Sequence, residues 1–140
     1  MDELVHIETT GRVRVLTMNR PAARNALSSD LVRSLSAALI AADADAEVSV
    51  IVLTGADPAF CAGIDLKELA RDREQYLAIL DADSCIRQVP RMSKPVLGAI
   101  NGATFTGGLE LALGCDLLIA SERAVSPTHT FASVCCPPAA

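Results

Sequence analysis

Two glycine-containing segments carry the residues of this 140-residue chain that could do chemistry. They are Phe60–Leu66, with the sequence FCAGIDL, and Asn101–Glu110, with the sequence NGATFTGGLE, and each comes close after an apolar run that predicts a buried strand. In a parallel sheet such strand ends border the ligand crevice, where glycine allows close approach and helix-start amides favour negative charge. Two converging amides would form an oxyanion hole for an enolate or a tetrahedral intermediate, although ordinary tight turns also fit both segments.

Glu110 lies within the first turn of a helix predicted to begin at Gly107. Its carboxylate could act as a general base beside such a hole, or it could merely complement the helix dipole. His6, in the first predicted strand, fits a structural role better. No Ser or Cys has the local signature of an activated nucleophile, and no glycine-rich nucleotide-phosphate motif is present.

The hydrophobic pattern predicts the elements that position these segments. Apolar and polar residues alternate on both sides of Thr10-Gly11, which predicts a β-hairpin, and Ser28-Ser29-Asp30 supplies helix N-caps. The segment Asp57–Gly63 reads as a loop. The expected order is ββαβαβαβ, with elements at Leu4–Glu8, Val13–Met18, Leu31 to about Ala42, Val48–Leu53, Asp65 to about Gln88, Pro95–Ile100, Gly107–Leu113 and Leu117–Ala120.

Composition favours one layered α/β domain. Apolar residues make up 51% of the chain but aromatic residues only 3%, so the core must be packed mainly with Ala, Val, Leu and Ile. The formal net charge of −5 argues against nucleic acid as a partner, because phosphate binding needs a basic face. The most apolar stretch, Leu109–Ala120, contains two acidic residues and is too short to span a bilayer. The acidic N-terminus leads into no apolar run, so we expect a cytoplasmic protein without a targeting segment.

The chain has five cysteines, of which Cys61, Cys85 and Cys115 lie far apart with no C-x-x-C spacing. Reduced and buried thiols are therefore expected for these three, and no metal site is predicted.

Four motifs occur in order along the chain: MNRP with NAL at residues 18–27, the strand ending in TG at residues 54–55, FCAGIDL, and NGATFTGGLEL. Together they resemble the successive signatures of the crotonase superfamily, which contains the enoyl-CoA hydratases and isomerases. The resemblance runs from about Ile7 to Val125. It implies a crotonase-like spiral of ββα units, incomplete at the C-terminus, in a domain over residues 1–125.

The resemblance also implies a function in fatty acid metabolism. The substrate would be an acyl-CoA thioester, with no further cofactor, and the amides of Ile64 and Gly107 would form the oxyanion hole beside the catalytic Glu110. The backbone at Ala62 would bind adenine, and Arg24 and Lys67 would face the CoA phosphates, although exposed basic residues are often only solvated. Family members assemble as homotrimers or hexamers.

A second catalytic glutamate of the hydratases corresponds to Thr130 in this chain. This departure leaves open another reaction of the superfamily, such as isomerisation or thioester hydrolysis, or acyl-CoA binding without turnover.

Residues 126–140, SPTHTFASVCCPPAA, contain three prolines and no charge, and they do not resemble the family. A one-nucleotide shift of the reading frame after Val125 would produce such a change, so we interpret these residues as a frameshifted, disordered tail, the alternative being a natural disordered one. As truncated, the chain is expected to be inactive, with its oligomeric assembly in doubt.

Overall fold

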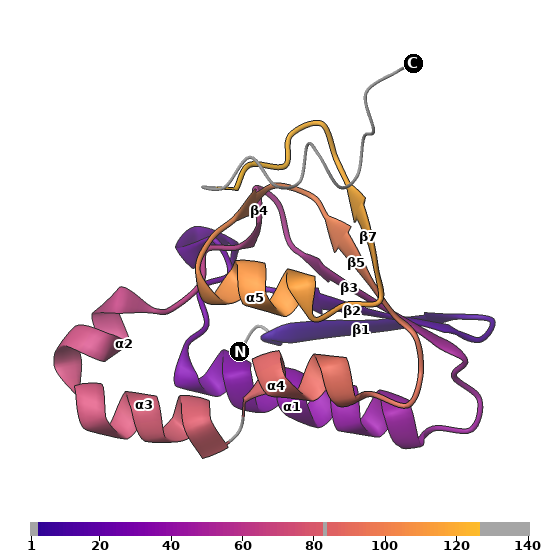
Figure 1. The fold of residues 1–140 in the computed structure, drawn as a ribbon, viewed down its shortest axis with the longest axis horizontal. Helices are drawn as coiled ribbons and strands as arrows, with labels where there is room; N and C mark the ends of the chain where they lie inside the picture. Colours follow the sequence, from indigo (N-terminus) through magenta and orange to yellow (C-terminus); the bar gives the residue numbers. More distant parts are fainter. Residues whose placement is uncertain (1–2, 83, 127–140) are drawn as a thin grey trace.

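A computed structural model describes residues 3–82 and 84–126 of the chain. A five-stranded sheet crosses the molecule, with helices packed against it (Figure 1). The elements in chain order are β1 (Val5–Thr10), β2 (Val13–Met18), η1 (Pro21–Ala23), α1 (Ser29–Ala44), β3 (Val50–Gly55), β4 (Ala59–Cys61), α2 (Leu66–Arg71), α3 (Arg73–Ala82), α4 (Cys85–Gln88), η2 (Val89–Arg91), β5 (Val96–Ile100), β6 (Ala103–Thr104), α5 (Gly107–Leu113) and β7 (Leu117–Ala120).

The large sheet has the strand order β1-β2-β3-β5-β7. Strands β1 and β2 form the predicted antiparallel hairpin, with Val5 opposite Met18 and Gly11 in the left-handed region at the turn (φ 58°). All later neighbours are parallel, so each pair needs a crossover connection. Helix α1 makes the first crossover, α2 to α4 lie in the second, and α5 lies in the third, which confirms the predicted mixed α/β order.

Helix α1 forms the main contact between the helical layer and the sheet. Ser28 caps it, because the Ser28 hydroxyl accepts a hydrogen bond from the Leu31 amide at 3.2 Å. The helix packs against β1, β2 and α4 and buries one apolar face. That face consists mainly of Leu31, Val32, Leu35, Ala38, Leu39 and Ala42. Leu31, Leu35, Ala38 and Leu39 recur at helical spacing, which is why the sequence predicted a helix here.

A second sheet, absent from the sequence-based prediction, contains only β4 and β6. These short parallel strands pair Ala59 with Ala103 and Cys61 with Thr104. The segment Asp57–Gly63 is therefore not simply a loop, as the sequence pattern suggested. A strand of two or three residues cannot show a period of alternation, so this pairing depends on tertiary contacts. The small sheet brings the two glycine-containing segments together.

The predicted helix from Asp65 to about Gln88 is wrong as a single element, since the structure divides it into α2, α3 and α4. Asp72 separates the first two helices, and its carboxylate accepts a hydrogen bond from the Gln75 amide at 3.0 Å. Ser84 caps α4 through the Arg87 amide. Side chains that bond to nearby amides in this way start new helices inside a region that is amphipathic throughout.

Among residues 3–82 and 84–126, no helix is both long and apolar enough to cross a membrane. Residues 127–140 lie outside the described part of the chain. The interpretation of residues 126–140 as a frameshifted tail therefore stays a prediction.

Candidate functional site

The segment after β4 turns sharply at Gly63, whose φ of +91° is a conformation that residues with a Cβ rarely adopt. It lies against residues 24–27: the Ala62 amide donates to Arg24 O at 2.9 Å, and the Leu27 amide donates to Gly63 O at 2.7 Å. Leu27 also forms an isolated parallel bridge with Ile64. These contacts fix the direction of the backbone on the N-terminal side of Ile64.

The segment before α5 packs directly against this turn. A Cβ added to Gly63 would overlap the Thr106 hydroxyl and lie 2.6 Å from Phe105 O, so only glycine allows the approach. The Ile64 amide points to the Thr106 hydroxyl oxygen, 3.4 Å away. Thr106 itself has a φ of 44°, unusual for a β-branched residue. The structure thus brings together the two glycine turns that the sequence singled out.

Gly107 is the first residue of α5, and a Cβ added to it would lie 3.9 Å from the Cα of Gly63. An amide at that position has no partner within its own helix. The next two amides bond to backbone carbonyls just before the helix: Gly108 N–H donates to Phe105 O at 2.8 Å, and Leu109 N–H donates to Thr106 O at 2.9 Å. The backbone groups of Ile64 and Gly107 therefore lie on two turns in contact, outside the sheet ladders.

A pocket of about 400 Å³ opens on the outer side of the Ile64 turn. The three residues predicted to bind CoA, Arg24, Ala62 and Lys67, all line it together with Ile64. Its remaining lining residues are Arg20, Ala22, Ala23, Ala26, Asp65 and Leu66. Two exposed cationic side chains, Arg24 and Lys67, thus lie at one opening with Ile64.

Glu110 lies one turn into α5, on the helix that begins with Gly107. Its side chain is exposed, and its amide donates to Thr106 O at 3.1 Å. Glu110 does not line the pocket that contains Ile64 and Lys67. Glu110 is therefore connected to the site only because it lies on the same helix as Gly107, and its catalytic role stays a prediction.

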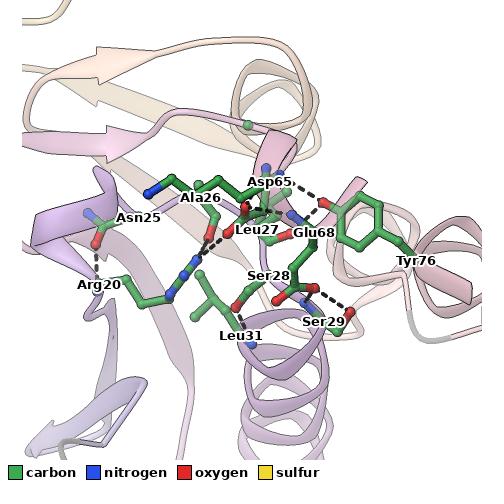
Figure 2. A network of polar contacts seen from close by, with 12 residues as sticks. Arg20, Asn25, Ala26, Leu27, Ser28, Ser29, Leu31, Asp65, Glu68 and Tyr76 are labelled. Carbon is green, nitrogen blue, oxygen red and sulfur yellow. Dashed lines mark hydrogen bonds and ion pairs between the residues drawn. The ribbon is translucent and has the colours of Figure 1, made fainter. Parts of the chain in front are cut away.

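A polar network that includes Arg20, Asp65 and Tyr76 connects the residues on either side of the Ile64 turn (Figure 2). The Arg20 guanidinium donates to Ala26 O at 2.6 Å and to the Asp65 carboxylate at 3.0 Å. Asp65 is nearly buried, and its other carboxylate oxygen accepts hydrogen bonds from the Lys67 and Glu68 amides at the start of α2. One carboxylate therefore links the NAL motif, the turn and helix α2.

The pKa of the Asp65 carboxyl lies below its ordinary value. Burial alone would raise this pKa, but the hydrogen bond and charge of Arg20, together with the amides of Glu68 and Lys67, more than offset it. Asp65 therefore stays ionised at neutral pH and holds Arg20 in place. By contrast, burial raises the pKa of the Cys61 thiol to about 12, so this cysteine beside the turn is a neutral packing residue.

Asn25 is fully buried and links three backbone segments. Its amide nitrogen donates to Ala56 O and Ala59 O, both at 2.8 Å, and its carbonyl oxygen accepts from the Arg20 amide at 2.8 Å. Its φ of 55° is one that asparagine tolerates better than most residues. This side chain holds the start of β4 against residues 20–25.

Sequence reasoning placed Arg20, Asn25 and Asp65 within motifs but gave them no role, and it missed Tyr76 altogether. The sequence does contain a sign that Asn25 and Asp65 are buried and hydrogen-bonded, because each is a polar residue directly next to apolar ones. Cys61, Cys85 and Cys115 are free thiols; Cys61 and Cys85 are buried as expected, whereas Cys115 is only half-buried. In the described ranges, 3–82 and 84–126, no three His, Cys, Asp or Glu side chains gather as a metal site would require.

Comparison with known proteins identifies the family. A sequence profile of the enoyl-CoA hydratase/isomerase family matches residues 8–138. The chain is 46% identical over 124 residues to a probable enoyl-CoA hydratase of Rhizobium meliloti, covering 87% of this chain and 48% of that protein. It is 42% identical over 127 residues to the 2,3-dehydroadipyl-CoA hydratase of Escherichia coli, with 89% and 48% covered.

Solved structures agree with the sequence match. The structure of an enoyl-CoA hydratase from Mycobacterium tuberculosis superposes with a TM-score of 0.75 at 52% identity, covering 94% of this chain and 54% of that one. The chain belongs to the enoyl-CoA hydratase/isomerase family and has the crotonase fold. It spans about half the length of the curated relatives it matches. The family acts on acyl-CoA substrates, as the resemblance implied.

Proposed function

We propose that this chain binds an acyl-CoA thioester and uses the Ile64 and Gly107 amides to stabilise negative charge on the thioester oxygen, which would replace the Thr106 hydroxyl as the acceptor of the Ile64 amide. The observation that carries the proposal is the contact between the two turns, with Ile64 at a pocket that Arg24 and Lys67 also line. When a nucleophile adds to the β-carbon of an enoyl thioester, charge develops on the carbonyl oxygen as an enolate. Two amide donors aimed at that oxygen lower the energy of this state more than that of the substrate.

The pocket supports the CoA part of the proposal. The Arg24 guanidinium and the Lys67 ammonium group would form charge-assisted hydrogen bonds with the CoA phosphates, while the adenine would lie along the backbone at Ala62. The substrate would therefore extend from the cationic rim of the pocket to the amide of Ile64. No cofactor other than the CoA of the substrate is required for this chemistry.

Glu110 would exchange the proton that accompanies enolate formation. Hydration as the family performs it uses two carboxylates, one for the water and one for the α-carbon, and the second position is Thr130 here. The absence of a carboxylate there favours a second candidate function, that of an isomerase, in which Glu110 takes a proton from the α-carbon of a 3-enoyl thioester to form the enolate and returns a proton to the γ-carbon without addition of water. The cytoplasmic location and the doubtful oligomeric assembly of this chain stay predictions.

Calorimetric titration of the full chain with butyryl-CoA tests the binding proposal. Arg24→Ala and Lys67→Ala should each weaken binding by about 3- to 10-fold, because each removes a charged partner of a phosphate. Arg73→Ala is the matched control, since Arg73 is an exposed arginine on α3 outside the pocket. Equal effects of the three substitutions, or no binding by the unaltered chain, would overturn the proposal.

Product analysis then separates the reactions. The chain is incubated with a 2-enoyl-CoA and, separately, with a 3-enoyl-CoA. Addition of water to the first supports a hydratase, whereas conversion of the second to its 2-enoyl isomer supports an isomerase. Glu110→Gln should abolish whichever reaction occurs, and full activity of this variant would exclude Glu110 as the catalytic acid or base.

A further inference from the structure

Tyr76 connects helix α3 to the backbone on both sides of Ile64. It is 2% exposed and is the only buried residue of α3. Its hydroxyl donates a hydrogen bond to Leu27 O at 2.6 Å and accepts one from the Asp65 amide at 2.9 Å (Figure 2). One hydroxyl thus satisfies a carbonyl and an amide that belong to two different segments of the site.

These two partners are the immediate supports of the Ile64 turn. Leu27 receives the Tyr76 hydroxyl at its carbonyl and bonds to Gly63 O through its own amide. The Asp65 amide, directly after Ile64, donates to the oxygen of the same hydroxyl. The Ile64 peptide is therefore fixed before it by Leu27 and after it by Tyr76. A donor that stabilises an oxyanion must hold its position to within about 0.5 Å, so such supports matter for its function.

The remaining contacts do not replace this hydroxyl. Arg20 bonds to the Asp65 carboxylate, which leaves the Asp65 amide, the group next to Ile64, to Tyr76. Burial raises the pKa of the Tyr76 phenol, so the hydroxyl keeps the proton that it donates to Leu27. The Glu68 carboxylate accepts hydrogen bonds from the amide and hydroxyl of Ser29 and so ties α2 to α1, not to the Asp65 amide.

We propose that Tyr76 is a positioning residue for the oxyanion hole: its hydroxyl holds the Ile64 amide toward the thioester oxygen and couples that amide to the position of helix α3. This inference rests on the proposed function of Ile64. Tyr76 acts through the Ile64 peptide and does not itself touch substrate. Its loss should weaken recognition of the thioester carbonyl and leave recognition of the CoA moiety unchanged, since Arg24 and Lys67 belong to other elements.

The test compares the full chain with Tyr76→Phe, which removes only the hydroxyl, and with Leu77→Ala, a control at an exposed position of the same helix. Amide hydrogen exchange of Asp65 is measured by NMR, and affinities for butyryl-CoA and for free CoA are measured by calorimetry. In Tyr76→Phe the Asp65 amide should exchange about 3- to 10-fold faster. The ratio of butyryl-CoA affinity to CoA affinity should fall by a similar factor, whereas Leu77→Ala should change neither quantity.

Each outcome decides the inference. Unchanged exchange of the Asp65 amide in Tyr76→Phe would overturn it, because the hydroxyl would then hold nothing. Equal loss of affinity for both ligands would also overturn it, since a general structural defect weakens both. If the unaltered chain binds neither butyryl-CoA nor CoA, the proposed function fails. Faster exchange of the Asp65 amide in Tyr76→Phe would then still show that the Tyr76 hydroxyl holds the turn.

Discussion

Replacement of Gly63 by alanine should destabilise the protein far more than the same change at Gly11. Both glycines have positive φ, +91° at Gly63 and +58° at Gly11, so both substitutions place a Cβ in a conformation that alanine avoids. Only at Gly63 does the new Cβ meet other atoms, because it would overlap the Thr106 hydroxyl and lie 2.6 Å from Phe105 O. At Gly11 nothing lies within 4 Å. The pair therefore isolates the contact between the two turns.

The expected magnitudes follow from these surroundings. Alanine in the left-handed region costs about 1–2 kcal/mol, which is the full effect expected for Gly11→Ala. At Gly63 the backbone oxygen of Phe105 cannot move aside, so overpacking adds about 1–3 kcal/mol. The free energy of unfolding should thus fall by about 2–5 kcal/mol in Gly63→Ala. This is a large part of the roughly 5–15 kcal/mol that typical domains possess.

Urea denaturation followed by circular dichroism measures both variants. A double-mutant cycle with Thr106→Ala adds a second check, since removal of the hydroxyl should recover part of the loss in Gly63→Ala. If Gly63→Ala and Gly11→Ala differ by less than about 0.5 kcal/mol, or if Thr106→Ala recovers nothing, the two turns do not pack against each other and cannot form a shared site.

Three further changes test the support of the site. Asp65→Asn should lower the free energy of unfolding at pH 7 by about 1–3 kcal/mol because Arg20 loses its partner. The pKa of Asp65 is lower in the folded than in the unfolded chain, so the ionised carboxylate stabilises the fold at pH values above the unfolded pKa, and this stabilisation is lost as the pH falls through the folded pKa. Identical acid unfolding curves for the unaltered chain and Asp65→Asn would contradict this. Asn25→Ala should cost about 2–4 kcal/mol in urea unfolding, because the carbonyls of Ala56 and Ala59 lose the hydrogen bonds that Asn25 donates, and a cost below about 1 kcal/mol would refute it. Gly108→Ala should cost about 1–3 kcal/mol in the same assay, because its Cβ would lie 2.8 Å from the Cys61 Cβ, and wild-type stability would show that α5 does not pack there.

The sequence predicted the elements whose signals are local. The hairpin at Gly11, the cap at Ser28 and the apolar strand predicted at Val48–Leu53 each depend on neighbouring residues, and all three are present, the strand as Val50–Gly55. The division of the Asp65–Gln88 stretch was missed although Asp72 and Ser84 are ordinary capping residues. An amphipathic pattern that continues through a cap hides the end of a helix, because periodicity averages over several turns.

The candidate site was predicted in its parts but not in its assembly. The glycine turns and the resemblance pointed to Ile64 and Gly107, and the structure brings those turns into contact. The sequence could not reveal the conformation of Thr106 or the two hydrogen bonds of Tyr76, because each depends on a residue distant in the chain. Such contacts leave no periodic signal, and they are the ones that position the Ile64 amide.

The most direct test of the proposed oxyanion hole is an NMR titration of the isotope-labelled full chain with butyryl-CoA and, in parallel, with free CoA. The amide resonances of Ile64 and Gly107 should shift together on addition of the thioester, because both donate to its carbonyl oxygen, while free CoA should shift Ala62 and Lys67 but leave Gly107 unchanged. If the thioester shifts neither Ile64 nor Gly107, or if free CoA shifts both equally, these amides do not form an oxyanion hole.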